Sequence, residues 1–587
     1  MIYKKRTHTC GELRNSHIGK TVTLTGWVDS RRDLGGVIFI DVRDRYGKTQ
    51  VVFAPQHNSE THRLAEILRS EYVISVTGKV ARRPAGTENA ELATGEVDIE
   101  ATELVVLNKA ETPPFPVEEH IQASEELRLK YRYLDLRRAN MQKNLMLRHK
   151  AYQAVRSYYD RNGFVEVETP ILMKSTPEGA RDYLVPSRTH RGKFYALPQS
   201  PQTYKQILMV AGLDKYFQIV KCFRDEDFRA DRQAEFTQID VEMSFVDEDD
   251  VIAMTEGCVT EVFEKVLGVN VKAPFRRMSY KEAMETYGSD KPDTRFDLMI
   301  RNCSDVVSAS AFRVFSETVK KGGIVAGICV PGLANYTRNQ LDGLTDYVKS
   351  IGAGGLIYMK MSPGKIENSV EKFVSAEESS KIAAQLQAKT GDLVLIISGP
   401  WQKALSILGA LRLEIANRLN LIAKDKWNFL WVVDFPLFEF NEEEKSLNSV
   451  HHPFTSPKDE DTALIERDPT RVRARSYDLV LNGTEVAGGS IRIHNTELQS
   501  KVFSLLGIGQ EEANKKFGFL LEAFKYGAPP HGGIAYGFDR IVMLMAGEES
   551  IRDVIAFPKT SSAMSLMDDS PSEVAKKQLD ELHIRIV

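Results

Sequence analysis

Cysteine is scarce in this sequence, and its few copies form no recognisable pattern. The five cysteines are scattered, odd in number and never spaced as Cys-x-x-Cys; they are Cys10, Cys222, Cys258, Cys303 and Cys329. A disulfide framework or a thiolate zinc site is therefore not expected, and a reducing cytoplasm fits. The N-terminus lacks the apolar core of a signal peptide, and no run reaches the roughly 18 apolar residues of a membrane span.

No charge of one sign dominates, and the common nucleotide motifs are missing. Lys plus Arg number 77 against 81 Asp plus Glu, a net charge of −4, so no global basic field indicates nucleic acid, although one domain can still carry a basic patch. Rossmann, P-loop and nucleophile-elbow glycine patterns are absent, which removes the main support for those folds. With 587 residues, 42% hydrophobic and 27% charged, the chain is typical of a globular protein of several domains.

The first hundred residues predict a small β domain. Three strand-like segments, a helical stretch and two further strands follow one another, at 21–28, 36–43, 49–53, 60–69, 72–80 and 96–107. This is the order of an OB-fold, a barrel that commonly binds single-stranded nucleic acid. Strand order alone leaves an unrelated small β domain as an equal alternative.

A proline-rich joint at 112–119 predicts a domain boundary. After it the pattern predicts a helix over about 140–160, ended by Gly163, and a strand at 164–168 that runs into Thr169-Pro170. Segments 194–197, 216–223 and 236–244 predict strands of one antiparallel sheet, because few helices separate them.

Between about residues 295 and 425 the pattern changes. Predicted strands at 322–330, 355–360 and 392–398 alternate with predicted helices at 337–351 and 375–390. Strand-rich sequence resumes at 429–436, so we interpret this segment as an α/β module inserted into a larger domain.

Two segments carry residues suited to phosphate and nucleobase binding. A charged loop follows an apolar strand at Arg224, where a guanidinium can meet a phosphate while Phe236 faces a base. The alternative is a solvated hairpin with surface ion pairs. Near the C-terminus, Arg540 opens an apolar helix after Gly537, where an anion can meet both the guanidinium and the helix N-terminus. A glycine-rich junction with a surface arginine is the alternative there.

A third segment, 477–492, combines carboxylates with an arginine. Asp478 and Glu485 can supply oxygen ligands to a divalent cation such as Mg²⁺ that bridges phosphates. Arg492 follows two glycines and can clamp a carboxylate. His451 and His452 are adjacent, so their side chains diverge and a zinc site is rejected.

Together these segments resemble the motifs of class II aminoacyl-tRNA synthetases. Phe223-Arg-Asp-Glu226 with Phe236 is similar to motif 2, and Gly537-Phe-Asp-Arg540 to motif 3. The stretch from Gly163 to Pro170 is similar to motif 1, whose strand forms a dimer interface. Further stretches resemble the bacterial-type aspartyl-tRNA synthetases over essentially the whole chain; these are 26–28 with 31–33, 176–185, 199–202 and 451–457.

The resemblance implies an α+β multidomain fold with an N-terminal OB-fold β-barrel, a class II antiparallel-sheet catalytic domain and an inserted α/β domain. The implied division is a 1–110 anticodon-binding domain, a 111–138 hinge, catalytic parts at 139–294 (motifs 1 and 2) and 426–560 (motif 3), the inserted domain at 295–425 and a C-terminal extension at 561–587. The inserted part resembles a domain of bacterial tRNA amidotransferases, and a structural or peripheral role is expected for it.

The implied activity is that of an aspartate–tRNA ligase. ATP and L-aspartate give aspartyl-adenylate and pyrophosphate, and the aspartyl group then passes to the 3′ end of tRNA-Asp with release of AMP. The implied partners are ATP, L-aspartate, tRNA and a second copy of the chain, with Mg²⁺ as cofactor, in the cytoplasm and without a membrane. Neither step needs an enzyme nucleophile, because positioning and cancellation of charge suffice.

The resemblance also implies residue roles. Arg224 holds the α-phosphate, Glu226 meets the adenine amino group, and Phe236 and Arg540 sandwich the base; Arg224 and Arg540 are the implied catalytic residues. The implied ATP-binding set is Arg224, Asp225, Glu226, Gln233, Phe236, Glu485, Gly537, Phe538, Asp539 and Arg540, with Asp478 and Glu485 as metal ligands. The implied aspartate-binding set is Glu178, Ser200, Gln202, Lys205, Asp240, His451 and Arg492. Because the side chain of aspartate is negatively charged, the residues around it are expected to carry a net positive charge.

In the first domain, the implied anticodon contacts are Arg32, Phe39, Gln50 and Asp98, although the family pattern has glutamate at the last position. Placement of Phe39 in the barrel core is the alternative. Leu34 and Gly86 bear on whether tRNA-Asn is charged as well. Leu34 resembles the strict enzymes and the loop around Gly86 resembles the relaxed ones, so both readings stay open.

Two rival functions remain at this point. A related class II enzyme for asparagine or lysine would share the motifs but need another side-chain site, and Arg492 with Lys205 favours an acidic substrate. A non-catalytic RNA-binding paralogue would keep the barrel but lose phosphate or metal ligands, whereas Arg224, Arg540 and the acidic pair are all present.

Overall fold

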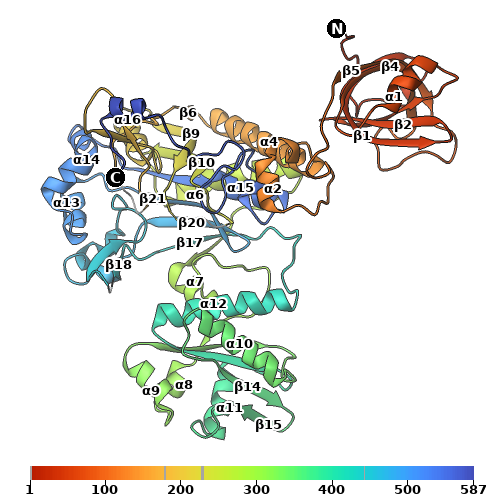
Figure 1. Cartoon of the computed structure of the whole chain (residues 1–587). Coiled ribbons are helices and arrows are strands. Elements are labelled where there is room, and N and C mark those ends of the chain that lie inside the picture. The colour runs from red at the N-terminus through yellow and green to blue at the C-terminus, as the bar shows by residue number, and fades with distance from the viewer. Residues whose placement is uncertain (1–2, 177–179, 227–229, 442) are drawn as a thin grey trace. The chain divides into compact units, whose positions relative to one another are not determined.

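The computed structural model describes residues 3–176, 180–226, 230–441 and 443–587. Its N-terminal part is a closed barrel with strand order β1-β2-β3-β5-β4 (Figure 1). The elements are β1 (Thr21–Leu34), β2 (Val37–Asp44), β3 (Gly47–Phe53), α1 (Ser59–Glu66), β4 (Val73–Arg82) and β5 (Val97–Asn108). Alternate residues such as Ile38, Ile40 and Val42 fill the barrel interior. The predicted OB-fold is confirmed.

Three helices follow the barrel: α2 (Glu125–Lys130), α3 (Arg132–Asp135) and α4 (Ala139–Arg161). The long helix matches its predicted range, and Gly163 follows it with φ +77°, a left-handed conformation that glycine adopts without strain. Asp135 is buried and accepts hydrogen bonds from three arginines, Arg128, Arg132 and Arg138. This cluster fixes the short helices of the joint.

The main sheet has eight strands in the order β11-β17-β20-β21-β22-β10-β9-β6. Their bounds are β6 (Val165–Glu166), β9 (Lys215–Phe223), β10 (Glu235–Ser244), β11 (Arg276–Ser279), β17 (Phe429–Val433), β20 (Ser476–Leu481), β21 (Thr484–Ile491) and β22 (His531–Gly537). Neighbouring strands are antiparallel except at the two edges, where β6 pairs with β9 and β11 with β17 in parallel. The strand predicted at 164–168 is thus only two residues long.

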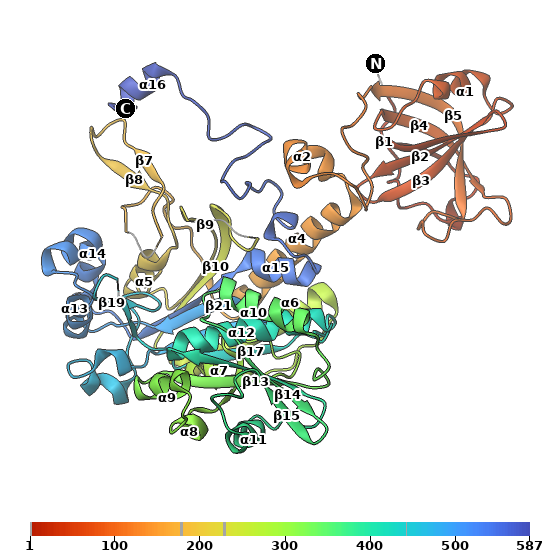
Figure 2. The same ribbon diagram turned by 60° about the horizontal axis from the view of Figure 1, so that its bottom comes forward.

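Two small hairpins stand outside this sheet. They are β7 (Leu184–Pro186) with β8 (Phe194–Ala196), and β18 (Phe438–Asn441) with β19 (Ser446–Ser449) (Figure 2). The expectation that segment 194–197 joins the main sheet is therefore wrong, because β8 pairs with β7. The remaining helices around the main sheet are α5 (Gln202–Val210), α6 (Glu248–Leu267), α7 (Tyr280–Tyr287), α13 (Thr496–Leu505), α14 (Gln510–Phe524), α15 (Phe538–Ala546) and α16 (Lys576–Leu582).

The segment between α7 and β17 forms a five-stranded sheet of its own, in the order β12-β13-β16-β14-β15. Its elements are β12 (Arg301–Asn302), α8 (Ser304–Val307), α9 (Arg313–Lys320), β13 (Ile324–Val330), α10 (Arg338–Ser350), β14 (Ile357–Ser362), β15 (Lys365–Asn368), α11 (Ala376–Gln385), β16 (Leu393–Gly399) and α12 (Trp401–Arg418). Leu395 and Ile397 belong to one apolar cluster and Val394 and Ile396 to another, so β16 is covered on both faces. This explains its uninterrupted apolar sequence.

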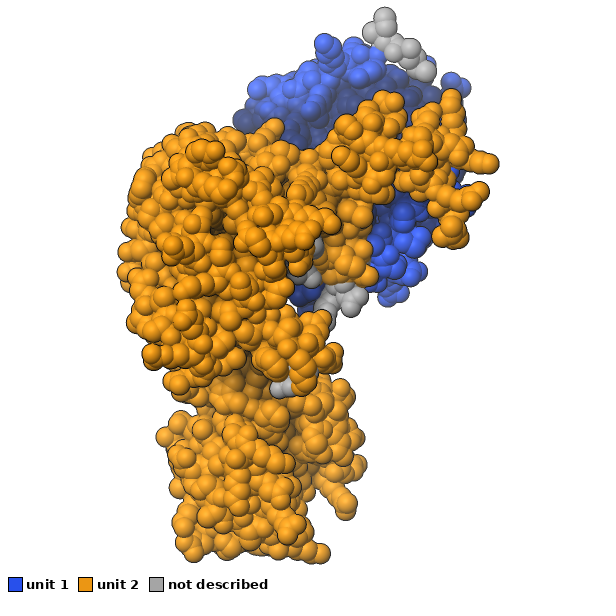
Figure 3. Space-filling model, turned by 90° about the vertical axis from the view of Figure 1, so that its left-hand side faces the viewer, with its two compact units in different colours: residues 1–149, 227–233, 546–574 blue, residues 150–226, 234–545, 575–587 orange. Residues whose placement is uncertain are grey.

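The chain divides into two compact units (Figure 3). One comprises residues 1–149, 227–233 and 546–574, and the other comprises residues 150–226, 234–545 and 575–587. All eight strands of the main sheet and the five-stranded sheet lie in the second unit. No helix in the described part of the chain combines the length and the apolar character that a membrane span requires.

Candidate active site

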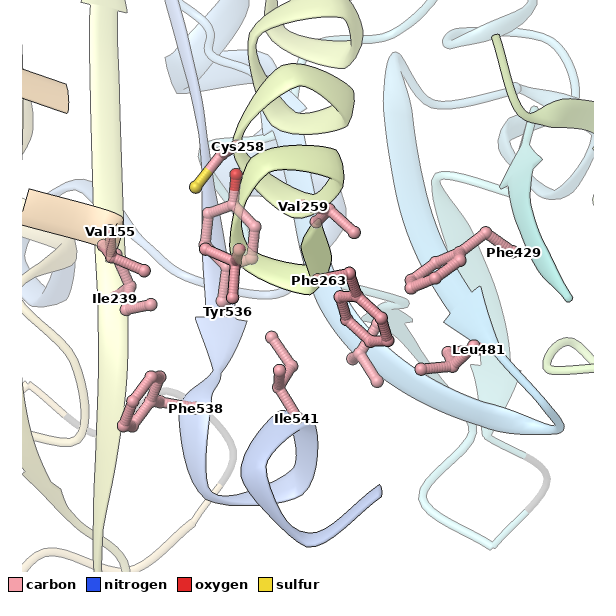
Figure 4. Close-up of a pocket in the computed structure, with 12 residues that line it drawn as sticks. Val155, Ile239, Cys258, Val259, Phe263, Phe429, Leu481, Tyr536, Phe538 and Ile541 are labelled. Carbon is pink, nitrogen blue, oxygen red and sulfur yellow. The ribbon is translucent and has the colours of Figure 1, made fainter. Parts of the chain in front are cut away.

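The two faces of the main sheet differ, because successive side chains of a strand point to opposite faces. Ile239, Tyr536 and Leu481 face one side, where they line an apolar cavity with residues of α4, α6 and α15 (Figure 4). Asp240 and Glu242 alternate with the core residues of β10 and point the other way. The opposite side, which we name the site face, therefore carries the polar groups.

Two rows of directly paired residues cross the site face. Asp478, Gly488, Ala535 and Asp240 oppose one another on β20, β21, β22 and β10. The neighbouring row is Ser476, Ser490, Gly533 and Glu242. Neighbouring strands are about 4.8 Å apart. The small residues on β21 and β22 therefore separate two acidic edges, Asp478 on β20 and the carboxylates of β10. They leave room above the strands for a ligand between the carboxylates.

Glycine is required in each row. A Cβ on Gly488 would lie 2.8 Å from Oδ1 of Asp478 and 3.5 Å from Oε1 of Glu485. A Cβ on Gly533 would lie 2.1 Å from Oε2 of Glu242. Both glycines therefore allow acidic side chains to lie over the neighbouring strand.

Arg492 follows β21 and is buried, with every guanidinium nitrogen engaged. Its Nε and Nη2 donate to the two carboxylate oxygens of Glu242, at 2.9 and 3.0 Å. Its Nη1 donates to Nε2 of His452 at 2.8 Å and to Oγ of Ser490 at 2.6 Å. Burial alone would lower the pKa of Arg492, but Glu242 outweighs it and the net shift is upward.

Lys205 of α5 completes this cluster. Its Nζ lies 2.8 Å from Oδ1 of Asp240 and 3.6 Å from Oε2 of Glu242, and all three side chains are buried. Burial raises the pKa of Glu242, but Arg492 and Lys205 reverse this, so that the pKa ends below its ordinary value. Two cations and two carboxylates balance, so the expectation of net positive surroundings is wrong for this group. Burying unpaired cations would cost too much free energy.

One carboxylate oxygen of this cluster has no partner. Oδ2 of Asp240 and Nε2 of Gln202 are buried without a hydrogen-bond partner among the described residues. Such groups are costly unless a ligand or water satisfies them. Ser200 lies just before them, where its Oγ accepts the backbone N–H of Gln202 at 3.3 Å.

A second acidic group lies at the other end of the rows. Nε2 of His451 is 3.4 Å from Oδ1 of Asp478. Burial lowers the pKa of His451, but Asp478 and then Glu485 outweigh it, and the net shift is upward. Burial, followed by repulsion from Asp478, raises the pKa of Glu485, which Arg540 offsets only in part. The positive charge near Asp478 and Glu485 is therefore too small to balance their two carboxylates.

Arg540 and Arg224 flank the site face. Nη1 of Arg540 donates to the backbone oxygen of Glu485 at 3.2 Å and lies 3.9 Å from its carboxylate. Arg224, just beyond β9, places its guanidinium 5.1 Å from the ring centroid of Phe236. Arg224 directly follows β9, Arg492 directly follows β21, and Arg540 lies in α15, which directly follows β22. All three therefore adjoin strands of one sheet, in which β10 and β22 lie between β9 and β21.

Other residues of the implied ATP set have structural contacts. Phe538 is buried and lines the apolar cavity (Figure 4). Its ring stacks on Tyr152, with 4.4 Å between the ring centroids. Asp539 accepts the backbone N–H of Thr237 at 2.7 Å. Asp539 therefore holds the start of α15 against β10, and Phe538 holds it against α4. The contact of both residues with nucleotide stays a prediction. Gly537 ends β22 opposite Gln238.

The rest of that set is placed as follows. The exposed Asp225 lies 4.0 Å from Arg181, and Glu226 next to it is half-buried. Gln233 belongs to the first compact unit, where its amide exchanges hydrogen bonds with the backbone of Lys559. Glu178 lies outside the described residues.

Glu242 and His452 were not singled out from the sequence. Glu242 stands two positions after Asp240, so the period of a strand places it on the same face and could have identified it. Burial and then Arg492 lower the pKa of His452 well below its ordinary range, so its Nε2 is free to accept from Arg492. In the sequence, the position of His452 next to His451 does not indicate this contact.

Three of the four implied anticodon residues form one hydrogen-bonded chain outside the apolar cluster of the barrel interior. Nη2 of Arg32 donates to Oε1 of Gln50 at 2.9 Å, and Nε2 of Gln50 donates to Oδ1 of Asp98 at 2.9 Å. Phe39 pairs with Arg32 across β1 and β2 and lies outside the apolar cluster of the interior. The alternative that Phe39 belongs to the barrel core is therefore wrong.

Leu34 and Gly86 both lie at turns of this barrel. Leu34 ends β1 and is 65% exposed. Gly86 has φ +86° in the turn after β4, and its N–H donates to Glu88 at 2.8 Å.

Comparison with known proteins decides the family. Residues 124–561 match the family model described as tRNA synthetases class II (D, K and N), and residues 22–107 match that of the OB-fold nucleic acid binding domain. The chain belongs to the class II tRNA synthetases. The two matches cover the barrel and the site face of this class II synthetase, so its predicted fold class is confirmed.

Similar curated proteins extend over the full length of this synthetase. A protein of Caldanaerobacter subterraneus subsp. tengcongensis named Aspartate--tRNA(Asp/Asn) ligase is 56% identical, covering 99% of this chain and 98% of the relative. A protein of Ruminiclostridium cellulolyticum named Aspartate--tRNA ligase is 54% identical with the same coverage. The crystal structure of asparaginyl-tRNA synthetase from Pyrococcus horikoshii with asparaginyl-adenylate has TM-score 0.59 and 20% identity, covering 95% of this chain and 99% of that one. At that identity it supports the fold alone.

Proposed function

We propose that this class II synthetase attaches L-aspartate to the 3′ end of tRNA-Asp through an aspartyl-adenylate formed from ATP. The observation that carries the proposal is the buried group of Arg492, Lys205, Asp240 and Glu242 beside a floor of small residues. Relatives at 54–56% identity bear names of aspartate ligases, which supports the same substrate.

Arg492 is the recognition element for the substrate side chain. Two of its nitrogens are held by Glu242, whereas Nη1 meets the neutral acceptors His452 and Ser490. A substrate carboxylate can replace a neutral acceptor at Nη1 without displacing Glu242. Asparagine offers only a neutral amide oxygen there, which binds the guanidinium more weakly than a carboxylate does.

The ammonium group of the substrate fits the opposite end of the cluster. Oδ2 of Asp240 is buried and lacks a partner among the described residues, so it can accept an N–H of the ammonium. Gln202 and Ser200 lie beside it on α5 and the preceding turn, and we propose that they orient the same end together with Glu178. The other oxygen of this carboxylate, Oδ1, is held by Nζ of Lys205 at 2.8 Å.

ATP lies, in this proposal, across the floor between the acidic edges. The adenine stacks between Phe236 and Arg540, and phosphate competes with the Phe236 ring for Arg224. The substrate α-carboxylate then attacks the α-phosphorus, while the arginines hold the reacting oxygens and offset their charge. Glu226, Asp225 and Gln233 complete the proposed nucleotide contacts.

Asp478 and Glu485 fit a divalent cation. Their oxygens face the same small space above Gly488, and the raised pKa of Glu485 reflects burial and repulsion that a cation would relieve. Among the described residues no group of three or more His, Cys, Asp or Glu could hold a metal, so phosphate oxygens would complete the coordination. Mg²⁺ bound there would neutralise phosphate charge, as the family resemblance implies.

For the barrel we propose anticodon reading by Arg32, Phe39, Gln50 and Asp98, with Phe39 as a stacking platform. We propose tRNA-Asn as a second substrate, because several relatives are named for both tRNAs. Leu34 and Gly86 are the positions at which we expect that choice to be made.

The proposal also covers the assembly of the protein and its location in the cell. β6 is the edge strand of the main sheet, and Val165, Ile171 and Leu172 near it are about half exposed. We propose that a second copy covers this edge in a homodimer. The five cysteines are free, which suits action in the cytoplasm.

The test is aminoacylation with labelled aspartate, ATP and Mg²⁺, using tRNA-Asp and tRNA-Asn in separate reactions. We expect charging of tRNA-Asp, abolished by chelation of the metal, and slower charging of tRNA-Asn. Charging of tRNA-Asp with asparagine or lysine in place of aspartate would contradict the proposed substrate. Failure to charge tRNA-Asn would contradict only the proposal that tRNA-Asn is a second substrate.

A further inference from the structure

The β7–β8 hairpin has a strongly cationic tip. Arg188, His190, Arg191 and Lys193 all lie in the seven-residue turn 187–193 or at its end, and all are exposed. From residue 183 to 213 the sequence has no Asp or Glu. None of the described carboxylates lies within 4 Å of Arg188, Arg191 or Lys193, whereas the exposed Arg276 and Arg277 each pair with a carboxylate. The positive charge of the tip is therefore not neutralised within the hairpin.

The turn is held in one conformation despite its exposure. Ser187 is buried, its N–H donates to the oxygen of Lys193 at 2.9 Å, and its Oγ accepts the N–H of His190 at 3.2 Å. Lys193 N–H in turn donates to the oxygen of His190 at 3.0 Å. Gly192 closes the turn with φ +71°. A fixed backbone lowers the entropy lost when the tip binds a partner.

The strands below the tip carry exposed aromatic rings. Phe194 is 48% and Tyr195 39% exposed, and as successive residues of β8 they point to opposite faces of the hairpin. Whichever face a nucleic acid lies against therefore presents a ring for stacking. Basic groups interleaved with exposed aromatics are suited to single-stranded or frayed RNA.

The hairpin is connected directly to the site. Ala196 pairs with Met173 and ends β8, and α5, which carries Lys205, begins six residues later. Extended chain rises about 3.3 Å per residue, so the tip lies roughly 10–20 Å beyond the end of β8. A tRNA whose 3′ terminus reacts in the site presents the backbone phosphates of its acceptor arm outside it.

From this arrangement we infer that the β7–β8 tip binds phosphates of the tRNA acceptor arm. The inference rests on the proposed function, since it assigns a further contact to the same tRNA. Charge complementarity selects the partner: arginines bind phosphates bidentately, and the exposed rings add stacking. The tip thereby helps to bring the 3′ end onto the site face.

The test compares R188A/R191A/K193A with a control of equal charge, K320A/K321A/K365A, on the exposed surface of the inserted module. The probe is a labelled RNA hairpin with the acceptor-stem sequence and a CCA end, and an anticodon hairpin serves as second ligand. We expect the tip variant to bind the acceptor hairpin at least ~10-fold more weakly, with the slope of log Kd against log salt smaller by about 2 to 3. The anticodon hairpin should bind it as it binds the wild type, and R188K/R191K should restore acceptor binding.

Aspartate-dependent pyrophosphate exchange, which needs no tRNA, separates this inference from the function beneath it. Exchange by the wild type and the tip variant at equal rates, with unchanged affinity for the acceptor hairpin, would overturn the hairpin assignment alone. Absence of exchange in the wild type would overturn the function. A tip variant that loses only self-association, or only binding to phosphatidylserine vesicles, would show that the surface serves another partner.

Discussion

A buried guanidinium needs a hydrogen-bond acceptor at each of its three nitrogens. Arg492 meets this need with Glu242, His452 and Ser490, and the same cluster contains Lys205. Removing one partner of such a buried pair costs about 3–5 kcal/mol, which corresponds to roughly 10²–10³-fold or more. The cluster is therefore the most sensitive part of the site.

Arg492→Leu is expected to lower aspartate activation by at least ~10²-fold while ATP binding stays close to wild type. The reason is that the guanidinium meets the amino acid, whereas the nucleotide contacts lie elsewhere on the sheet. Aspartate-dependent pyrophosphate exchange and equilibrium ATP binding measure the two effects. Arg276→Leu, which breaks an exposed ion pair with Glu282, is the matched control and should change neither. An unchanged exchange rate in Arg492→Leu would refute the role of this residue.

The His451–Asp478 contact makes stability depend on pH. Attraction by Asp478 outweighs burial and raises the pKa of His451, so the charged pair stabilises the fold below about pH 6.5 and weakens as pH rises through the raised value. His451→Gln should therefore lower Tm more at pH 6 than at pH 9. His57→Gln, at an exposed histidine of the barrel domain, is the control. An equal loss of Tm at both pH values would contradict the assigned ion pair.

Single residues were predictable to different degrees. Arg224, Phe236, Arg540, Asp478 and Arg492 were identified in advance because glycine, charge and apolar segments mark strand ends and helix starts. The ion pair of Glu242 with Arg492 could not be inferred in this way, because the two residues meet only through the pairing of β10 with β22 and of β22 with β21. Pairing between strands hundreds of residues apart leaves no local signal.

The inserted module is attached through a contact between two helices. Gly409 of α12 lies against Gly288 at the end of α7, and a Cβ on Gly409 would come 2.4 Å from the backbone oxygen of Gly288. Arg412, one helical turn along, donates to the backbone oxygens of Asp293, Phe296 and Leu298. Backbone atoms cannot move aside as flexible side chains can.

Gly409→Ala is therefore expected to destabilise the protein by about 1–3 kcal/mol, seen as a lower Tm in calorimetry. Gly343→Ala on α10 is the matched control, because a Cβ there meets nothing within 4 Å. That substitution should stabilise its helix by about 0.5–1 kcal/mol. Equal effects of the two substitutions would contradict the close contact of α12 with α7.

Gln50→Ala on the barrel should weaken charging of tRNA without changing adenylate formation. The amide of Gln50 joins Arg32 to Asp98, so its loss disturbs the polar chain and leaves the interior intact. Aminoacylation and pyrophosphate exchange, measured side by side, test this. Thr21→Ala, at an exposed position of β1, is the control. A parallel loss of both activities would instead indicate misfolding.

Elements with a strong period were predicted well, and short ones were not. Four of the five barrel strands, α4, β13 and β16 appear close to their predicted ranges, since alternation or helical spacing extends over many residues. β1 was predicted at 21–28 but continues to Leu34. β6, β12, β15 and the β18–β19 hairpin are two to four residues long, and tertiary pairing rather than local pattern makes them strands. The strand β8 was predicted from the sequence, but β7 and its pairing with β8 were not.

The whole catalytic sheet is assembled from distant parts of the chain. Its central neighbours β10 and β22 lie about 290 residues apart, and the inserted module separates β11 from its partner β17. Composition and period indicated an insertion, but only the family resemblance implied that the flanking parts form one sheet. The interpretation of residues 295–425 as an inserted domain is compatible with the separate five-stranded sheet.

The most direct measurement is ATP–pyrophosphate exchange with aspartate, asparagine and lysine supplied one at a time. Exchange with aspartate should exceed that with asparagine by ~10²-fold or more, because only a carboxylate forms an ion pair with Arg492, and lysine should give none. Equal or faster exchange with asparagine or lysine would contradict the assignment of this site to a dicarboxylic amino acid.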